Sequence, residues 1–382
     1  MKKDLAYVCN YLKGLIIPCI PDDFVIAEPF RHGLTDDELK KGIVAFRKFL
    51  YELYDKIADD KNRFDVARGE KYNPESGEDS IQKCFPIIND IAVILSTLGI
   101  YGKFSAEPRK ELVVNGNDLL TPLSSTKPPA MNKISNKRKM EVFNYLSDIG
   151  FYFEDLNISE SIDFSKVGTF YVTYENDDFV ILGLKLLAEA KKNVKSGYQK
   201  FMTTFMRCDF YPLANATPKA HIASAKEFVG PQPPEIRDWI VEIEKLLMDN
   251  GCKISCFFLS NTNGDSSFSY VSQKGKKTVC RIAMGINGCL IEIRGNHFTN
   301  ETNILPELPE HMLSVIRSGG CGGCAGNPNF KSCRHGGPFK FTYNGESLER
   351  CAFGGYVFLL DNPDERQLLK KWVELELERN EE

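Results

Sequence analysis

The sequence predicts an α+β protein with a mainly helical N-terminal half and a C-terminal half built on a mostly antiparallel sheet flanked by helices. Helical apolar spacing dominates the first half of the chain, and alternating strand patterns dominate the second. A Gly-Pro-Gln-Pro-Pro stretch ends the segment between them. We therefore expect a helix-rich domain over residues 1–212, a linker over 213–234 and an α+β domain over 235–382.

Two helices are predicted in the first hundred residues. Thr35 and Glu38 have the spacing of a capping box, which predicts a helix over about residues 36–58. The apolar residues that follow at helical spacing are Leu39, Ile43, Phe46, Leu50, Leu53 and Ile57. The segment 85–98 is apolar almost all round and predicts a buried helix, with Gly99 as its left-handed C-cap.

A winged-helix-like unit is predicted over residues 134–192. Ser135 has the position of an N-cap, and Gly150 ends that helix. Strands over 151–156 and 169–175 follow, and a second helix completes the order of helix, strand, strand and helix.

A basic stretch lies at the start of that unit, because residues 119–140 hold several basic side chains and no acid. Lys137, Arg138 and Lys139 are the candidate contacts to nucleic-acid phosphates. The alternative is a solvated charged loop, since no aromatic residues interleave with the basic ones and the chain as a whole is acidic.

Strand patterns become regular after the linker. A helix is predicted over 235–249 and another over 307–317, and Asn362 with Pro363 is typical of the start of a last helix. The predicted strands cover about residues 252–259, 267–272, 277–284, 288–294, 338–343 and 348–360.

The twelve cysteines fall into two groups. Eight lie in apolar contexts and are predicted to be small buried side chains. These are Cys9, Cys19, Cys84, Cys208, Cys252, Cys256, Cys280 and Cys289. The other four, Cys321, Cys324, Cys333 and Cys351, lie in or just after a glycine-rich loop.

The clustered cysteines predict a metal site. Cys321 and Cys324 form a C-x2-C pair, and four thiolates suit a closed tetrahedral zinc ion of structural type. His335 is a substitute nitrogen ligand if Cys351 stays in its strand. An iron–sulfur cluster, a redox dithiol and free thiols remain as alternatives.

A ligand site is predicted on the C-terminal sheet. Glu292 and Arg294 share one side of their strand, and Glu292 together with an aromatic ring such as Tyr270 suits a cationic ligand. The alternative is that these charges pair across strands on a solvated face.

The order of elements after about residue 200 resembles the GyrI-like small-molecule-binding modules of bacteria, over less than half of the chain. The resemblance implies an α+β sheet that forms a cleft for cationic or aromatic ligands, with Glu292 in the place of an acidic residue at its base. The cysteine cluster departs from the usual pattern of that family. Together with a winged-helix-like unit, the resemblance implies an effector-responsive regulator.

Composition and motifs narrow the class of function. The contents of 42% hydrophobic, 11% aromatic and 26% charged residues exclude a disordered or fibrous chain, and no apolar run spans a bilayer. The net charge of −4 argues against a protein whose whole surface binds nucleic acid. We expect a cytoplasmic location, because no signal-like cleavage site follows the first apolar residues. No catalytic motif with supporting context occurs, so a non-enzymatic, zinc-stabilised protein that binds a small molecule or a protein partner is the first hypothesis. A nucleic-acid-binding regulator that uses residues 127–149 is the second.

Overall fold

The computed structural model describes residues 4–64, 85–105, 110–122, 130–159, 161–193, 205–216, 221, 223–259, 265–274, 276–299, 303–318, 339–350 and 354–379. These residues form the α+β protein that the sequence predicts, with a helical N-terminal half and an antiparallel sheet with helices in the C-terminal half. The chain divides into two compact units. Unit 1 comprises Met1–His221 and Leu259–Gly264, and unit 2 comprises Ile222–Phe258 and Asp265–Glu382.

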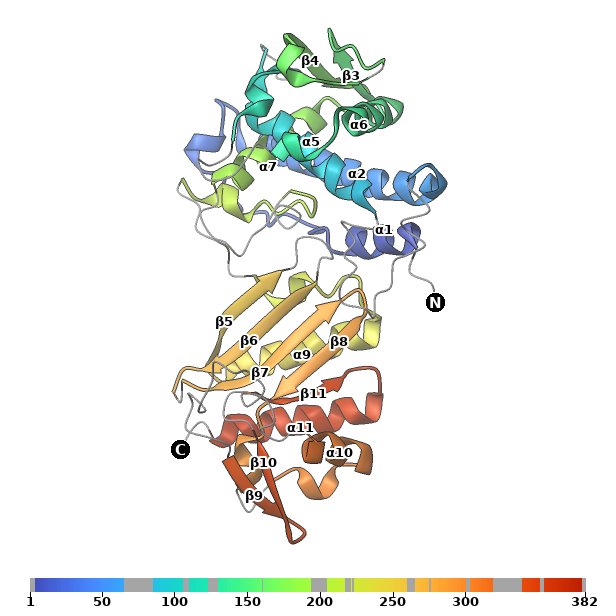
Figure 1. Ribbon diagram of the computed structural model, residues 1–382. Coiled ribbons are helices and arrows are strands. Elements are labelled where there is room, and N and C mark those ends of the chain that lie inside the picture. Colours follow the sequence, from blue (N-terminus) through green and yellow to red (C-terminus); the bar gives the residue numbers. More distant parts are fainter. Residues whose placement is uncertain are drawn as a thin grey trace. The chain divides into compact units, whose positions relative to one another are not determined.

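Unit 1 is built on a group of helices around α7, against which both α2 and α5 pack (Figure 1). Its helices are α1 (Leu5–Gly14), α2 (Asp36–Asp59), α5 (Pro86–Tyr101), α6 (Asn136–Asp148) and α7 (Phe179–Asn193). The backbones of α2 and α7 approach closely, because a Cβ added at Gly183 would lie only 2.1 Å from the carbonyl oxygen of Gly42. Glycine at Gly183 therefore sets how near the two helices lie.

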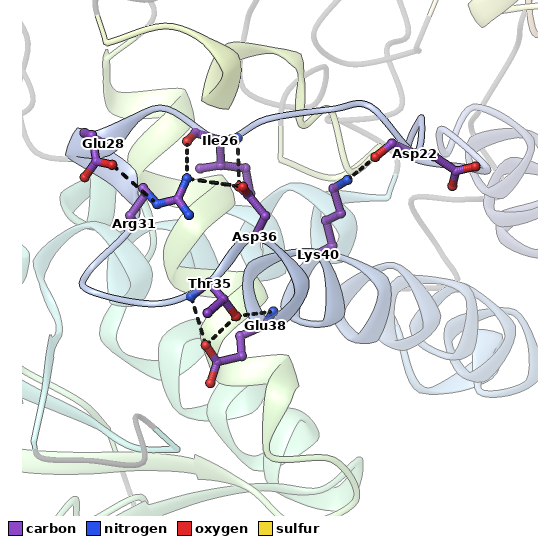
Figure 2. Close-up of polar contacts among 8 residues, drawn as sticks. All are labelled: Asp22, Ile26, Glu28, Arg31, Thr35, Asp36, Glu38 and Lys40. Carbon is purple, nitrogen blue, oxygen red and sulfur yellow. Dashed lines mark hydrogen bonds and ion pairs between the residues drawn. The ribbon is translucent and has the colours of Figure 1, made fainter.

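The start of α2 confirms the predicted capping box. The Glu38 backbone N–H donates to Thr35 Oγ1 at 3.4 Å, and the Thr35 N–H donates to Glu38 Oε2 at 2.9 Å (Figure 2). Two of the N–H groups that lack a partner within the helix are thus satisfied by side chains.

The segment before α2 is fixed to the first turns of that helix by further polar contacts (Figure 2). Arg31 Nη1 donates to the Asp36 carboxylate, with a shortest distance of 3.2 Å, and to the Ile26 carbonyl oxygen at 3.3 Å. Lys40 Nζ donates to the Asp22 carbonyl oxygen at 2.6 Å. Side chains of α2 and of the preceding segment thereby order a connection whose regular secondary structure is limited to the short 3-10 helix η1 (Glu28–Phe30).

The predicted C-cap role of Gly99 is wrong. The helix α5 continues to Tyr101, and Gly102 follows it in an extended conformation. A Cβ added at Gly99 would lie 2.6 Å from the Ala188 Cβ of α7, so this glycine permits close helix packing and does not end a helix. A glycine with positive φ does follow the end of α6 (Asn136–Asp148) at Gly150 and the end of α9 (Pro234–Asp249) at Gly251, where φ is +106° and +71°.

Unit 1 also contains a four-stranded sheet of order β1-β2-β4-β3. Its strands are β1 (Lys103–Phe104), β2 (Leu112–Asn115), β3 (Phe151–Glu154) and β4 (Thr169–Tyr174), all paired antiparallel. The predicted order of helix, strand, strand and helix is confirmed as α6, β3, β4 and α7. β4 pairs with β2 as well as with β3, so the hairpin of β3 and β4 is part of a wider sheet. The winged-helix-like unit stays a prediction.

Unit 2 is built on a five-stranded sheet of order β11-β8-β7-β6-β5 (Figure 1). Its strands are β5 (Cys252–Leu259), β6 (Ser266–Ser272), β7 (Thr278–Gly285), β8 (Gly288–Ile293) and β11 (Tyr356–Leu359). The helices of the unit are α9 (Pro234–Asp249), α10 (Glu310–Ser318) and α11 (Pro363–Arg379), and a separate two-stranded sheet consists of β9 (Phe339–Tyr343) and β10 (Glu346–Arg350). The single strand predicted over 348–360 is therefore wrong, since β10 and β11 belong to different sheets.

The two faces of the five-stranded sheet differ in what covers them. Tyr270, Cys280 and Ile293 are register partners and share the face that we call the inner face. The helices α9 and α11 pack on it, because Tyr270 Oη donates to Glu244 of α9 at 2.8 Å and the Phe358 ring lies 5.4 Å from the Trp372 ring of α11. The opposite face, which we call the outer face, therefore carries Glu292 and Val357, which alternate with these residues.

Two buried carboxylates stabilise the inner side of unit 2. Glu244 Oε1 accepts hydrogen bonds from Tyr270 Oη and, at 2.8 Å, from the Ala225 N–H. Glu376 of α11 lies 2.8 Å from Nδ1 of the equally buried His297. Buried charges need such partners. Glu244 thus ties α9 to the sheet, and Glu376 ties α11 to the segment that contains His297.

Among the residues described, no helix has the length and apolar character that crossing a bilayer requires.

Candidate functional site

Three charged side chains gather on the outer face of the unit 2 sheet. Glu292 on β8 lies between Arg281 of β7 and Arg294, with shortest nitrogen–oxygen distances of 3.8 and 3.6 Å. Glu292 Oε1 also accepts a hydrogen bond from the Gly355 N–H at 3.0 Å. Arg281 Nε donates to Ser267 Oγ at 2.6 Å, which holds the guanidinium over the sheet. The charges of the three side chains sum to a single positive charge.

Aliphatic side chains lie beside this group on the edge strand β11. Val357 pairs with Glu292 in the strand register, and Leu359 pairs with Leu290. Val357 is 48% exposed and Leu359 is 59% exposed, although both belong to a regular strand. The outer face thus combines exposed aliphatic groups on β11 with charged side chains on the next two strands, which is an ordinary composition for an interaction surface.

The structure brings only two of the three predicted ligand residues together. Glu292 and Arg294 lie on the outer side of the sheet and form an ion pair. Tyr270 is fully buried on the inner face, where burial and then the charge of Glu244 raise its pKa. Its ring therefore belongs to the core of unit 2.

Cross-strand pairing, which the sequence left open as the alternative for Glu292, is present. The carboxylate has two guanidinium neighbours and a backbone donor, so its charge is already balanced by the protein. This arrangement favours an acidic partner group at the exposed Arg281 over a cation at Glu292.

The three residues predicted to contact nucleic acid do not form one exposed basic surface in unit 1. Lys137 is exposed, whereas Arg138 Nε donates to Asp90 Oδ2 at 2.6 Å. Lys139 is only 4% exposed, and its Nζ donates to Asn136 Oδ1 and lies 5.6 Å from the centre of the Phe164 ring. Burial lowers the pKa of Lys139. Nucleic-acid binding stays a prediction, to which this geometry adds nothing.

The predicted metal ligands Cys321, Cys324, Cys333, Cys351 and His335 lie outside the described residues. Within the described part of the chain, no group of three or more His, Cys, Asp or Glu side chains has a metal-binding arrangement. The zinc site is therefore a proposal from sequence spacing.

The cysteines predicted to be buried are mostly confirmed. Cys9, Cys208, Cys252, Cys280 and Cys289 are buried free thiols. Burial raises the pKa of Cys252 to about 11 and that of Cys208 and Cys289 to about 12. The prediction is wrong for Cys19, which is exposed, and Cys84 and the side chain of Cys256 lie outside the description.

Sequence patterns did not indicate a hollow in unit 1, between the end of the turn η2 (Lys61–Arg63), the start of α5 and the side of α6. Its volume is about 420 Å³, and Arg63 and Arg138 both line it. Its lining residues come from three separate segments, so no local sequence pattern indicates it. Arg138 is the one lining residue that the sequence singled out, as a basic residue.

Comparison of the chain with protein-family models, with curated proteins and with solved structures found no match.

Proposed function

We propose that this chain is a non-catalytic binding protein that holds a polypeptide partner on the outer face of the unit 2 sheet. The observation that carries the proposal is the exposure of Val357 and Leu359 beside the charged group of Arg281, Glu292 and Arg294. Small-molecule sites are usually concave, whereas side chains that project from an edge strand suit contact with a broad protein surface.

The charges indicate the chemistry of the partner. Glu292 neutralises one of its two arginine neighbours, and Arg281 is exposed on the far side of Glu292 from the aliphatic residues. A partner with an apolar side chain opposite Leu359 and a carboxylate opposite Arg281 would be complementary to this surface.

Leu359→Asp is expected to weaken the binding of peptides selected on the wild-type chain from a random peptide display library by at least about tenfold. An aspartate would place a charge in the apolar contact, and folding should be unaffected because Leu359 is 59% exposed. Affinity is measured by fluorescence anisotropy of the labelled peptides, which should be rich in acidic and apolar residues.

The matched control is Val44→Asp, because Val44 is an aliphatic residue of α2 in unit 1 and is 45% exposed. It should leave peptide binding unchanged. The proposal fails if no peptide is enriched, or if the enriched peptides bind the Leu359→Asp and Arg281→Gln variants as well as they bind the wild type.

We further propose that Cys321, Cys324, Cys333 and Cys351, with His335 as the substitute for Cys351, hold a structural zinc ion. The support is the C-x2-C spacing and the glycines that let the chain turn around a metal. An iron–sulfur cluster is the competing occupant of the same thiolates.

Purified protein is expected to contain about one zinc per chain, and the double variant Cys321→Ser/Cys324→Ser should lose both the metal and thermal stability. Maleimide labelling mapped by mass spectrometry should modify the exposed Cys19 before chelation and the four ligand cysteines only afterwards. Cys208 and Cys289 serve as internal controls, because both thiols are fully buried and out of reach of the reagent. Purified protein that contains no metal and is equally stable would contradict the zinc proposal. Bound iron together with inorganic sulfide would instead assign the site to an iron–sulfur cluster.

A further inference from the structure

The hollow in unit 1 has the composition of a small-molecule site. Its apolar wall is formed by Phe64, Ile87 and Met140. Its volume of about 420 Å³ lies in the ordinary range for ligand pockets, which combine apolar walls with a few polar groups.

Two arginines line the hollow, and each is held by a carboxylate through one nitrogen. Arg138 Nε donates to Asp90 Oδ2 at 2.6 Å, and Arg63 Nη1 lies 2.8 Å from Asp148 Oδ2. The Arg63 guanidinium also lies 5.0 Å from the centre of the Tyr145 ring. The contact with the buried Asp90 orients the Arg138 guanidinium before any ligand arrives, and the ring of Tyr145 supports that of Arg63.

Both arginines keep unused hydrogen-bond donors. Arg138 Nη1 is 3.9 Å from Glu141 Oε2, which is too long for a hydrogen bond, and Nη2 has no partner among the residues described. Arg63 uses only Nη1 in its ion pair with Asp148. A guanidinium carries five N–H groups, so each arginine keeps donors beyond the nitrogen that its carboxylate engages.

We propose that this hollow binds a small organic carboxylate, with Arg63 and Arg138 donating to the carboxylate oxygens and with Phe64, Ile87 and Met140 contacting an apolar or aromatic body. Guanidinium geometry matches carboxylate oxygens, and the apolar wall supplies the burial that such a ligand needs. This site lies wholly within unit 1 and is independent of the binding face proposed for unit 2.

The surrounding charges favour one negative charge on the ligand over two. Glu141 also lines the hollow, and Asp90 and Asp148 stand behind the two arginines. Three carboxylates therefore surround the two arginines, and they repel a phosphate dianion more strongly than a singly charged carboxylate.

Isothermal titration of the full chain with phenylacetate and 3-phenylpropionate tests the assignment, with phenylacetamide as the uncharged analogue. The acids are expected to bind with a Kd below roughly 10 mM, the limit for a ligand of this size at low ligand efficiency. The amide should bind at least about tenfold more weakly, because it cannot make charge-assisted hydrogen bonds to both arginines.

Arg63→Gln is expected to weaken binding of the acids at least about tenfold, and Met140→Glu should abolish it by adding a carboxylate to the wall. These positions are chosen because Arg63 is 45% exposed and Met140 is half-buried, whereas Arg138→Gln would leave the buried Asp90 without its arginine. The matched control for Arg63→Gln is Lys137→Gln. It removes the same charge from an exposed residue of α6 that does not line the hollow. Its binding should equal that of the wild type.

Three results would overturn the proposal: no saturable binding by either acid, equal binding by the amide, or full binding by Arg63→Gln. Tighter binding of phenyl phosphate than of phenylacetate would contradict the carboxylate class and assign the hollow to phosphate esters.

Discussion

Gly183→Ala is expected to destabilise unit 1 by about 3 kcal/mol, the upper end of the usual range for overpacked contacts. The added methyl group would lie 2.1 Å from the Gly42 carbonyl oxygen and 2.6 Å from the Phe46 Cβ, so α2 would have to move away from α7. Alanine is otherwise the better helix former by about 0.5–1 kcal/mol, which makes the sign of the effect informative. Urea unfolding followed by far-ultraviolet circular dichroism, with hydrogen exchange of α2 and α7, measures it.

The control for this variant is Gly168→Ala, since a Cβ at Gly168 meets no heavy atom within 4 Å. It should leave stability unchanged or raise it by a few tenths of a kcal/mol. A Gly183→Ala protein as stable as the wild type would show that α2 and α7 do not need their close approach.

Glu244→Leu is expected to destabilise unit 2 by about 3–5 kcal/mol, because several donors around a buried carboxylate would lose their acceptor together. Glu244 accepts from Tyr270 Oη and Ser224 Oγ, and from the N–H groups of Ala225 and Lys226. Glu244→Gln should cost less, since it keeps the shape and one acceptor oxygen. Tryptophan fluorescence during urea unfolding is the measurement, because both tryptophans of the chain, Trp239 and Trp372, lie in unit 2.

Glu242→Leu is the matched control on the same helix α9. Glu242 forms an exposed ion pair with Lys370, and such pairs contribute at most about 1 kcal/mol. Equal destabilisation by the Glu242 and Glu244 variants would contradict a special role for the buried carboxylate.

Local signals in the sequence predicted local structure well. The capping box of Thr35 and Glu38 and the N-cap of α11, where Asn362 Oδ1 accepts from the Asp364 N–H at 3.0 Å, are both present. Each depends on side chains a few residues from the backbone groups that they satisfy, so spacing alone indicates them.

Features that depend on distant partners were not predictable in the same way. Gly99 looks like a helix end in sequence, but its role is set by Ala188 on another helix. Strand parity placed Glu292 and Arg294 together, but Tyr270 could not be assigned to a face without the register of the sheet, which shifts between Tyr270 and Val271. The hollow of unit 1 joins three segments, and no single one of them shows it.

The position of α11 has a consequence for how the chain folds during synthesis. This helix supplies Trp372, which contacts Phe358 on the inner face, and Glu376, which pairs with His297. The apolar strands β6, β7 and β8 leave the ribosome long before residues 363–379, so the part of their inner face that α11 covers waits for roughly ten seconds at ordinary rates of translation. Interrupted synthesis before α11 would therefore release a sheet with part of its apolar face exposed, the kind of surface that promotes aggregation.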